Sequence, residues 1–181
     1  MGLFNRKNRN NSNMNQDNSI ESTIGINAPE NSAIDITRSF SNLTDELNNE
    51  IEINKGVLVI RMQDTHEFAA ISTWNNGVLR DGLRVTLPGK SSLFEKVAEE
   101  GSVYTEDFCS SFSGNFFERK LLLDDNSRSF MVLPLKAEGK VVGILAYSSE
   151  EPIAFAVFEE GKFRNRAEKF ATEIHSLITQ L

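Results

Sequence analysis

The sequence predicts an α+β domain with a central antiparallel sheet flanked by helices. Two observations support this fold class. Short apolar, β-branched runs occur in pairs separated by turn residues, and amphipathic helical stripes lie near both ends of the folded region. The 181 residues suit one domain with an appendage, and a hydrophobic content of 39% permits a packed core.

The first 33 residues are predicted to form a disordered tail. Asparagine occupies positions 5, 8, 10, 11, 13, 15, 18, 27 and 31, and large apolar groups are few. Such a segment buries too little surface to offset the entropy lost on ordering. We therefore expect the folded domain to span residues 34–181, with the tail acting as a tether.

The domain is expected to begin with an amphipathic helix from about Ile34. Its apolar positions recur at steps of three and four, with acidic residues between them; they are Phe40, Leu43, Leu47 and Ile51. Asn54-Lys55-Gly56 is expected to end this helix, because glycine is common just after a helix terminus.

Two strands and a turn are expected next. Residues 57–62 and 68–74 are mostly apolar or β-branched, and Asn75-Asn76-Gly77 supplies turn residues after the second run. A shorter strand is expected over 84–87, ended by Pro88-Gly89.

A short helix is predicted over residues 93–100. Ser91-Ser92 provides an N-cap, Glu95 is placed to complete the cap, and Gly101 follows the last turn. The stretch 102–126 is interpreted as irregular. It carries five aromatic residues: Tyr104, Phe108, Phe112, Phe116 and Phe117.

The last part of the chain gives the clearest pattern. Residues 129–135 and 141–147 predict a hairpin joined by 136–139. A long amphipathic helix is expected to follow up to the last residue of the sequence. Its apolar face comprises Phe163, Ala167, Phe170, Ala171, Ile174, Leu177, Ile178 and Leu181.

The hairpin carries a resemblance to a known family. A strand ending in Pro134-Leu135, followed by Glu138-Gly139 and a strand with Gly143 at its centre, resembles the core signature of GAF domains. Phe155 or Phe158 with Glu159-Glu160 is similar to the acidic helix start that follows in that family. The resemblance covers about residues 36–181, and the related PAS fold is the nearest alternative.

The resemblance implies a sensory or regulatory module with a small-molecule effector held between the sheet and a lid formed by residues 93–125. The expected ligand-binding residues are Phe108, Cys109, Phe112, Phe116, Phe117, Met131 and Gly143. The phenylalanines would either close over an apolar ligand or fill the cavity themselves, and filling is favoured because buried phenylalanine usually belongs to a core. Sheet packing alone would also account for Gly143.

Several chemistries found in that family are not expected here. Cyclic-nucleotide binders carry Asn-Lys where this chain has Ser148-Ser149, and bilin binders carry a histidine where Ser110 follows Cys109. Free methionine sulfoxide reductases use several cysteines, whereas this chain has one, so we expect Cys109 to be a small buried hydrophobe. His66 and His175 match no metal-binding spacing. The sequence therefore predicts neither an enzyme nor a metal site, and it identifies no cofactor.

Charge and composition limit the partners. A net charge of −7 argues against nucleic acid, no apolar run approaches the roughly 18 residues of a membrane span, and a single cysteine fits the reducing cytoplasm. With no room in the chain for an output domain, a sensory module would signal to a separate partner. The alternative is a ligand-free dimeric adaptor.

Both functions share one structural expectation. The apolar stripes of the first and last helices should meet, either within one chain or across a homodimer as a four-helix bundle.

Overall fold

The computed structural model describes residues 30–62, 65–81, 83, 85–156 and 160–179. The strands are β1 (Lys55–Arg61), β2 (Phe68–Asn75), β3 (Val78–Arg80), β4 (Val85–Leu87), β5 (Tyr104–Glu106), β6 (Ser129–Ala137) and β7 (Lys140–Ser149). The helices are α1 (Glu30–Asn48), α2 (Leu93–Glu100), the 3₁₀ turn η1 (Cys109–Ser111), α3 (Phe116–Leu122) and α4 (Glu160–Thr179). The predicted tail up to residue 29, Arg84, Phe158, Glu159 and Leu181 lie outside the described residues.

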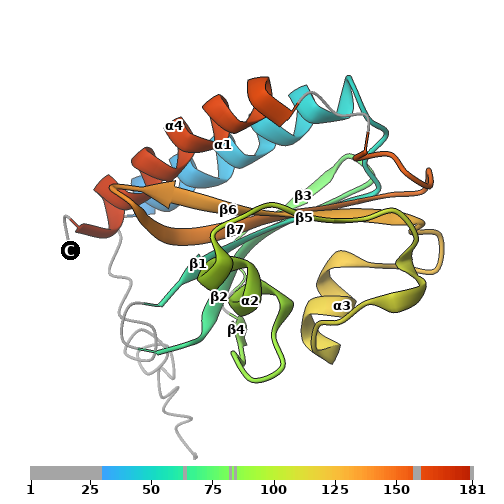
Figure 1. Ribbon diagram of the computed structural model, residues 1–181. Coiled ribbons are helices and arrows are strands. Elements are labelled where there is room, and N and C mark those ends of the chain that lie inside the picture. The colour runs from blue at the N-terminus through green and yellow to red at the C-terminus, as the bar shows by residue number, and fades with distance from the viewer. Residues whose placement is uncertain (1–29, 63–64, 82, 84, 157–159, 180–181) are drawn as a thin grey trace, which may run out of the picture.

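All seven strands belong to one antiparallel sheet in the order β3-β2-β1-β7-β6-β5, with β4 also pairing with β2. Figure 1 shows α1 and α4 side by side on one face of this sheet and α2 and α3 on the other. The predicted fold class is confirmed. None of the described helices is long and apolar enough to cross a membrane.

Both faces of the sheet are buried, so the central strands are apolar on both sides. On β1, Leu58 and Ile60 contribute to the core beneath α1 and α4, whereas Val57 and Val59 contribute to the core beneath α2 and α3. This alternation is the period of two expected for a strand between two helical layers.

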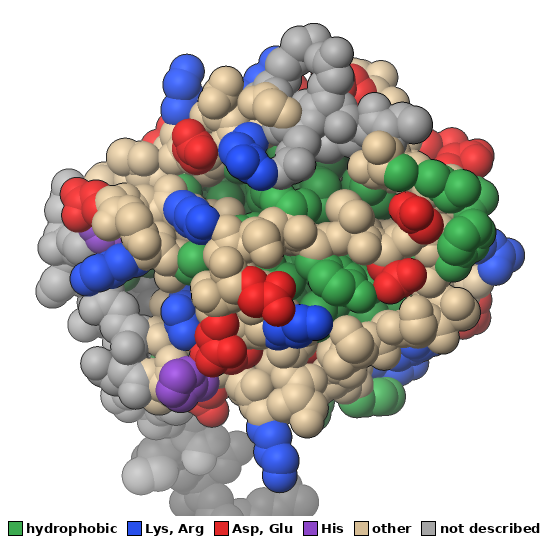
Figure 2. Space-filling model, in the orientation of Figure 1, with side chains coloured by type: hydrophobic (Ala, Val, Ile, Leu, Met, Phe, Trp, Pro, Cys, Tyr) green, Lys and Arg blue, Asp and Glu red, His purple; other side chains and the backbone are tan. Residues whose placement is uncertain are grey.

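On the face of the molecule shown in Figure 2, acidic and basic side chains are interspersed.

The apolar stripes of the terminal helices meet within one chain. Phe40, Leu43 and Leu47 of α1 share a core with Phe170 and Ile174 of α4. The helices run antiparallel, because residues further along α1 contact residues earlier on α4. The two contacts are Ser39 Oγ with Glu173 Oε2 at 3.2 Å, and Glu46 with Arg166 in an ion pair. The start of α1 and the end of α4 therefore lie at the same end of the domain.

The end of the first helix differs from the prediction. Helix α1 ends at Asn48, whose side-chain oxygen accepts a hydrogen bond from the Ile53 amide at 2.8 Å. Gly56 lies within β1, opposite Tyr147 of β7, where a Cβ atom would come within 2.9 Å of the tyrosine ring. Gly56 therefore makes room for an aromatic ring and does not end a helix.

The stretch interpreted as irregular contains β5 and α3. Helix α3 begins with a reciprocal cap, in which the Asn115 side chain accepts hydrogen bonds from the amides of Phe117 and Glu118. The Glu118 carboxylate in turn accepts one from the Asn115 amide at 2.9 Å. The spacing Asn-x-x-Glu was the signal that could have identified this helix. The strand β3 was also missed, although the preceding Asn76-Gly77 turn, with φ of 46° and 83°, was expected.

Candidate functional site

The space between the sheet and the α2–α3 layer is occupied by the chain's own side chains. Phe68 and Phe94 pack edge to face at 6.2 Å between ring centroids, and Phe112 packs against Phe130 at 5.4 Å. Phe68, Phe94, Phe130 and Leu122 are fully buried in this core. The region that the resemblance assigns to a ligand is therefore packed as a hydrophobic core.

The predicted ligand-binding aromatics take different positions in the structure. Phe112 packs against this core, whereas Phe108, Phe116 and Phe117 are 56%, 65% and 51% exposed. Phe108 and half-buried Cys109 line a surface cleft of about 520 Å³ together with Arg119 and Arg128.

The two predicted ligand-binding residues on the sheet are separated from those aromatics. The Met131 side chain belongs to the core on the opposite face, beneath α1 and α4. Gly143 lies where β7 approaches β1 so closely that a Cβ atom would be 2.5 Å from the Val59 carbonyl oxygen. Sheet packing alone thus accounts for this glycine.

Cys109 is expected to react slowly with alkylating agents. Burial raises the pKa of its thiol to about 11, with Arg119 opposing the rise. Because the thiolate is the nucleophile, the reaction with iodoacetamide at pH 8 should be about 100-fold slower than that of a cysteine whose pKa is 9.0, and it should accelerate about tenfold per pH unit up to pH 10. Mass spectrometry would follow the adduct, with the chain unfolded in urea as the control. Equal rates in the folded and unfolded chain would contradict the prediction.

A buried carboxylate occupies the start of α2. Glu118 of α3 accepts hydrogen bonds from the amides of Leu93 at 3.0 Å and Phe94 at 3.1 Å, and also from the Ser92 hydroxyl. The amide groups at a helix N-terminus bind anions readily. Here the chain supplies that anion itself. Glu118 was not among the residues predicted to be functional.

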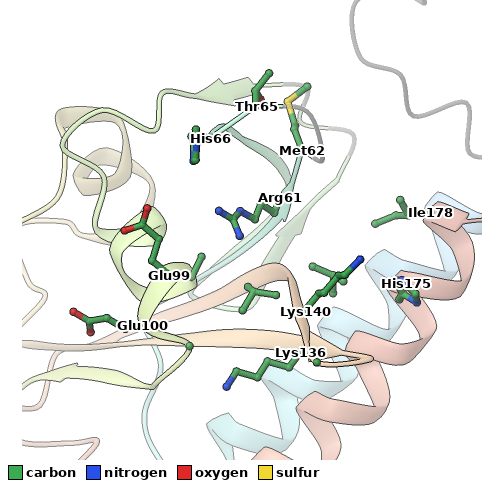
Figure 3. Close-up of a pocket in the computed structure, with 15 residues that line it drawn as sticks. Arg61, Met62, Thr65, His66, Glu99, Glu100, Lys136, Lys140, His175 and Ile178 are labelled. Atoms are coloured by element: carbon green, nitrogen blue, oxygen red, sulfur yellow. The ribbon is translucent and has the colours of Figure 1, made fainter.

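A second, open cleft of about 920 Å³ lies at the other end of α2. Its lining residues are Arg61, Met62, Thr65, His66, Ala98, Glu99, Glu100, Gly101, Lys136, Gly139, Lys140, Val141, Val142, His175 and Ile178. Figure 3 shows acidic side chains on the α2 side, lysines on the β6–β7 hairpin, and His175 and Ile178 on the last turns of α4. This cleft was not predictable from local sequence patterns, because its walls come from four separate parts of the chain.

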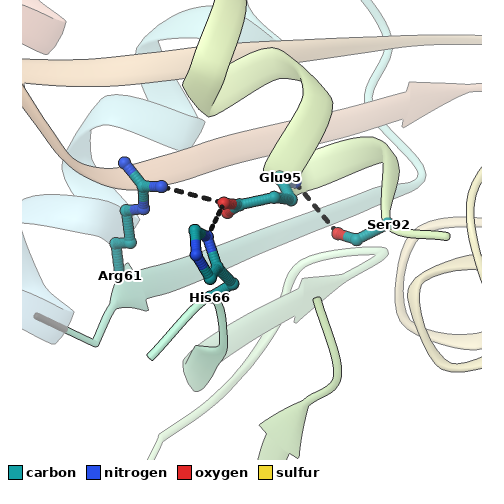
Figure 4. Close-up of polar contacts among 4 residues, drawn as sticks. All are labelled: Arg61, His66, Ser92 and Glu95. Carbon is teal, nitrogen blue, oxygen red and sulfur yellow. Dashed lines mark hydrogen bonds and ion pairs between the residues drawn. The ribbon is translucent and has the colours of Figure 1, made fainter. Parts of the chain in front are cut away.

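Glu95 contacts two residues of this cleft and does not complete the α2 cap. Its backbone amide donates to the Ser92 side chain at 2.9 Å, as the cap prediction requires. Its carboxylate turns instead toward β1 and the β1–β2 connection, where Oε1 lies 2.9 Å from Arg61 Nη2 and 2.6 Å from His66 Nδ1 (Figure 4). Glu118 takes the place at the helix N-terminus that was expected for Glu95.

No protein-family model and no curated protein sequence matches the chain. Among solved structures, the GAF domain of a two-component sensor histidine kinase from Bacillus halodurans is similar with a TM-score of 0.63 and 15% identity, covering 83% of this chain and 96% of that one. A GAF domain/HD domain protein from Geobacter sulfurreducens is similar with a TM-score of 0.61 and 14% identity, covering 80% and 95%. These likenesses establish that the chain has the GAF fold.

The prediction from the residue patterns that the chain is not an enzyme is wrong, because solved enzymes share its fold. A type II free methionine-R-sulfoxide reductase from Thermoplasma acidophilum is as similar as the sensor domain, with a TM-score of 0.63, 12% identity and coverage of 81% of this chain and 97% of that one. The same architecture thus supports catalysis in one protein and forms part of a sensor kinase in another. The fold leaves both functions open for this chain.

Proposed function

We propose that this GAF-fold domain is a regulatory module in which a small polar effector, bound in the cleft between α2 and the β6–β7 hairpin, acts on the end of α4. The observation that supports the proposal most directly is that His175 and Ile178, from the last turns of α4, line the same cleft as Glu99 and Lys136. A bound molecule would therefore contact both α2 and α4, although these two helices cover opposite faces of the sheet (Figure 1).

The charges of the cleft suggest the chemistry of the effector. Glu99 and Glu100 come from α2, and Lys136 and Lys140 come from the β6–β7 hairpin, so the two walls carry opposite charge. A small molecule with one cationic and one anionic group would complement both walls. Binding in this cleft does not require a cavity in the core beneath α2 and α3, which is packed with side chains.

The terminal helices are the proposed output surface. Because α1 and α4 run antiparallel, a shift at the end of α4 also reaches the start of α1. Their apolar faces are already buried within the chain, so a homodimer or a separate partner would contact the remaining polar faces. The expected cytoplasmic location fits this role.

Native mass spectrometry of the freshly purified chain tests the proposal. We expect an extra mass that disappears on denaturation and that is reduced when Lys136 and Lys140 are both replaced by alanine, but not when exposed Lys90 is replaced. Adding the released molecule back should slow amide hydrogen exchange in the last turns of α4. A bare chain mass, with no exchange change in α4 on adding small zwitterions, would contradict the proposal.

A ligand-free adaptor is the second candidate, and the packed core beneath α2 and α3 favours it. In this function the anion position at the start of α2 is permanently taken by Glu118, and the aromatic side chains on that face act only in packing. The same mass measurement distinguishes the two candidates, because an adaptor would show a bare chain or a bare dimer.

A further inference from the structure

We propose that His66, Glu95 and Glu99 form a binding site for a divalent transition-metal ion. One potential ligand atom from each residue lies within 4.8 Å of the other two. Glu95 and Glu99 are four residues apart on α2 and so share one helix face, and His66 comes from the β1–β2 connection. Metal binding requires neither an effector nor a partner, so this inference goes beyond the proposed function.

A buried oxygen without a partner points to a ligand at this site. Glu95 is only 7% exposed, and its Oε2 atom is buried without a hydrogen-bond partner, while Oε1 contacts Arg61 and His66. A buried carboxylate oxygen left without a partner lowers stability. A cation bound by the Glu95 carboxylate would compensate for this loss.

The neighbouring residues are arranged to hold such a site. The Arg61 guanidinium, 2.9 Å from Glu95 Oε1, orients the carboxylate from outside the ligand set, as hydrogen bonds to metal-binding carboxylates commonly do. The backbone of His66 packs closely against Gly89, where a Cβ atom would come within 1.9 Å of the His66 carbonyl oxygen. The His66 side chain is 79% exposed and can adjust toward an ion.

The ligand types indicate which ions would bind. Two carboxylates against one guanidinium leave a net negative charge, which attracts a cation, and an imidazole nitrogen favours zinc, nickel or cobalt over magnesium or calcium. Ligand atoms around tetrahedral zinc lie roughly 3.4 Å apart, so the exposed His66 and Glu99 side chains need to move only slightly. Three protein ligands leave one coordination position open, and two of the three residues, His66 and Glu99, line the cleft.

Calorimetric titration of the full, untagged chain with ZnCl₂ tests this site, with Cys109→Ser as the background to remove the thiol. We expect one zinc ion per chain, with affinity lowered at least about tenfold by His66→Ala and by Glu99→Gln. Both residues are exposed, so the variants should fold, and circular dichroism would verify this. The controls are Glu100→Gln, the next acidic residue on α2, and His175→Ala, the other histidine of the cleft; both should bind zinc as tightly as the background. Failure to bind one zinc ion, or equal weakening in the controls, would overturn the proposal.

Discussion

Replacing Glu118 with alanine should lower the free energy of unfolding by about 4 kcal/mol, because it removes the partner of several buried donors at once. The amides of Leu93 and Phe94 and the hydroxyl of Ser92 all donate to this carboxylate at the start of α2, and the Asn115 amide donates to it at the start of α3. The side chain is fully buried, so water does not replace it without rearrangement. Urea denaturation followed by circular dichroism measures the change.

Two further variants separate charge from volume. Glu118→Gln keeps the size but turns an amide NH₂ group toward N–H donors, so we expect a loss of about 2 kcal/mol. Glu100→Gln changes an exposed acidic residue near the opposite end of α2 and should alter stability by less than about 0.5 kcal/mol. A Glu118→Ala variant within about 1 kcal/mol of wild type would show that the carboxylate does not hold the two helix starts together.

The alanine variant also tests whether Glu118 occupies an anion site. If it does, sodium formate should raise the urea midpoint of Glu118→Ala more than sodium chloride at equal ionic strength, because a small carboxylate can bind the freed amides. Wild type should respond equally to both salts. An identical response of the variant to the two salts would contradict this interpretation.

The strands were predictable because both faces of the sheet are buried, so each central strand is a short, mostly apolar run in the sequence. The runs 57–62, 68–74, 129–135 and 141–147 contain the β-branched and apolar residues of the central sheet, and the β6–β7 turn carries a glycine at φ 77°. The terminal helices were predictable for a similar reason, since their stripes repeat at the helical period. Each of these patterns is contained in a single short, continuous segment of the sequence.

Residues 93–125 and the candidate site are held by contacts between residues far apart in the sequence, which local patterns do not reveal. Ser92 has a glutamate three residues later, yet its hydroxyl and the first amides of α2 bond to Glu118, 26 residues beyond Ser92. His66 and Glu95 meet across 29 residues because the β1–β2 hairpin turns back toward α2. The position of Glu95 three residues after Ser92 predicts a cap, because cap geometry is local. Its contact with Arg61 forms only when β1 and α2 come together in the folded domain.

Replacing Tyr147 with alanine should lower the free energy of unfolding by about 4 kcal/mol, since large aromatic-to-alanine changes in a core remove 3–5 kcal/mol in order of magnitude. Tyr147 is fully buried on β7, stacks on Phe40 of α1 at 6.4 Å and meets Phe163 of α4 edge to face at 6.0 Å. It thus joins both terminal helices to the sheet. Urea denaturation measures the loss.

The loss of stability in Tyr147→Ala should be concentrated in α1 and α4. The variant therefore tests the output surface proposed for these two helices. Burial raises the pKa of Tyr147 well above its usual range, so the hydroxyl stays protonated and can donate to Thr44 Oγ1 at 3.2 Å, while Thr44 donates to the Phe40 carbonyl. Tyr147→Phe removes only this hydrogen bond and should lower stability by about 1 kcal/mol. In hydrogen-exchange mass spectrometry, Tyr147→Ala should reduce the protection of α1 and α4 more than that of α2 and α3. Equal loss on both faces would mean that the terminal helices do not open separately from the rest of the domain, and the output surface proposed for them would then have to act without local undocking.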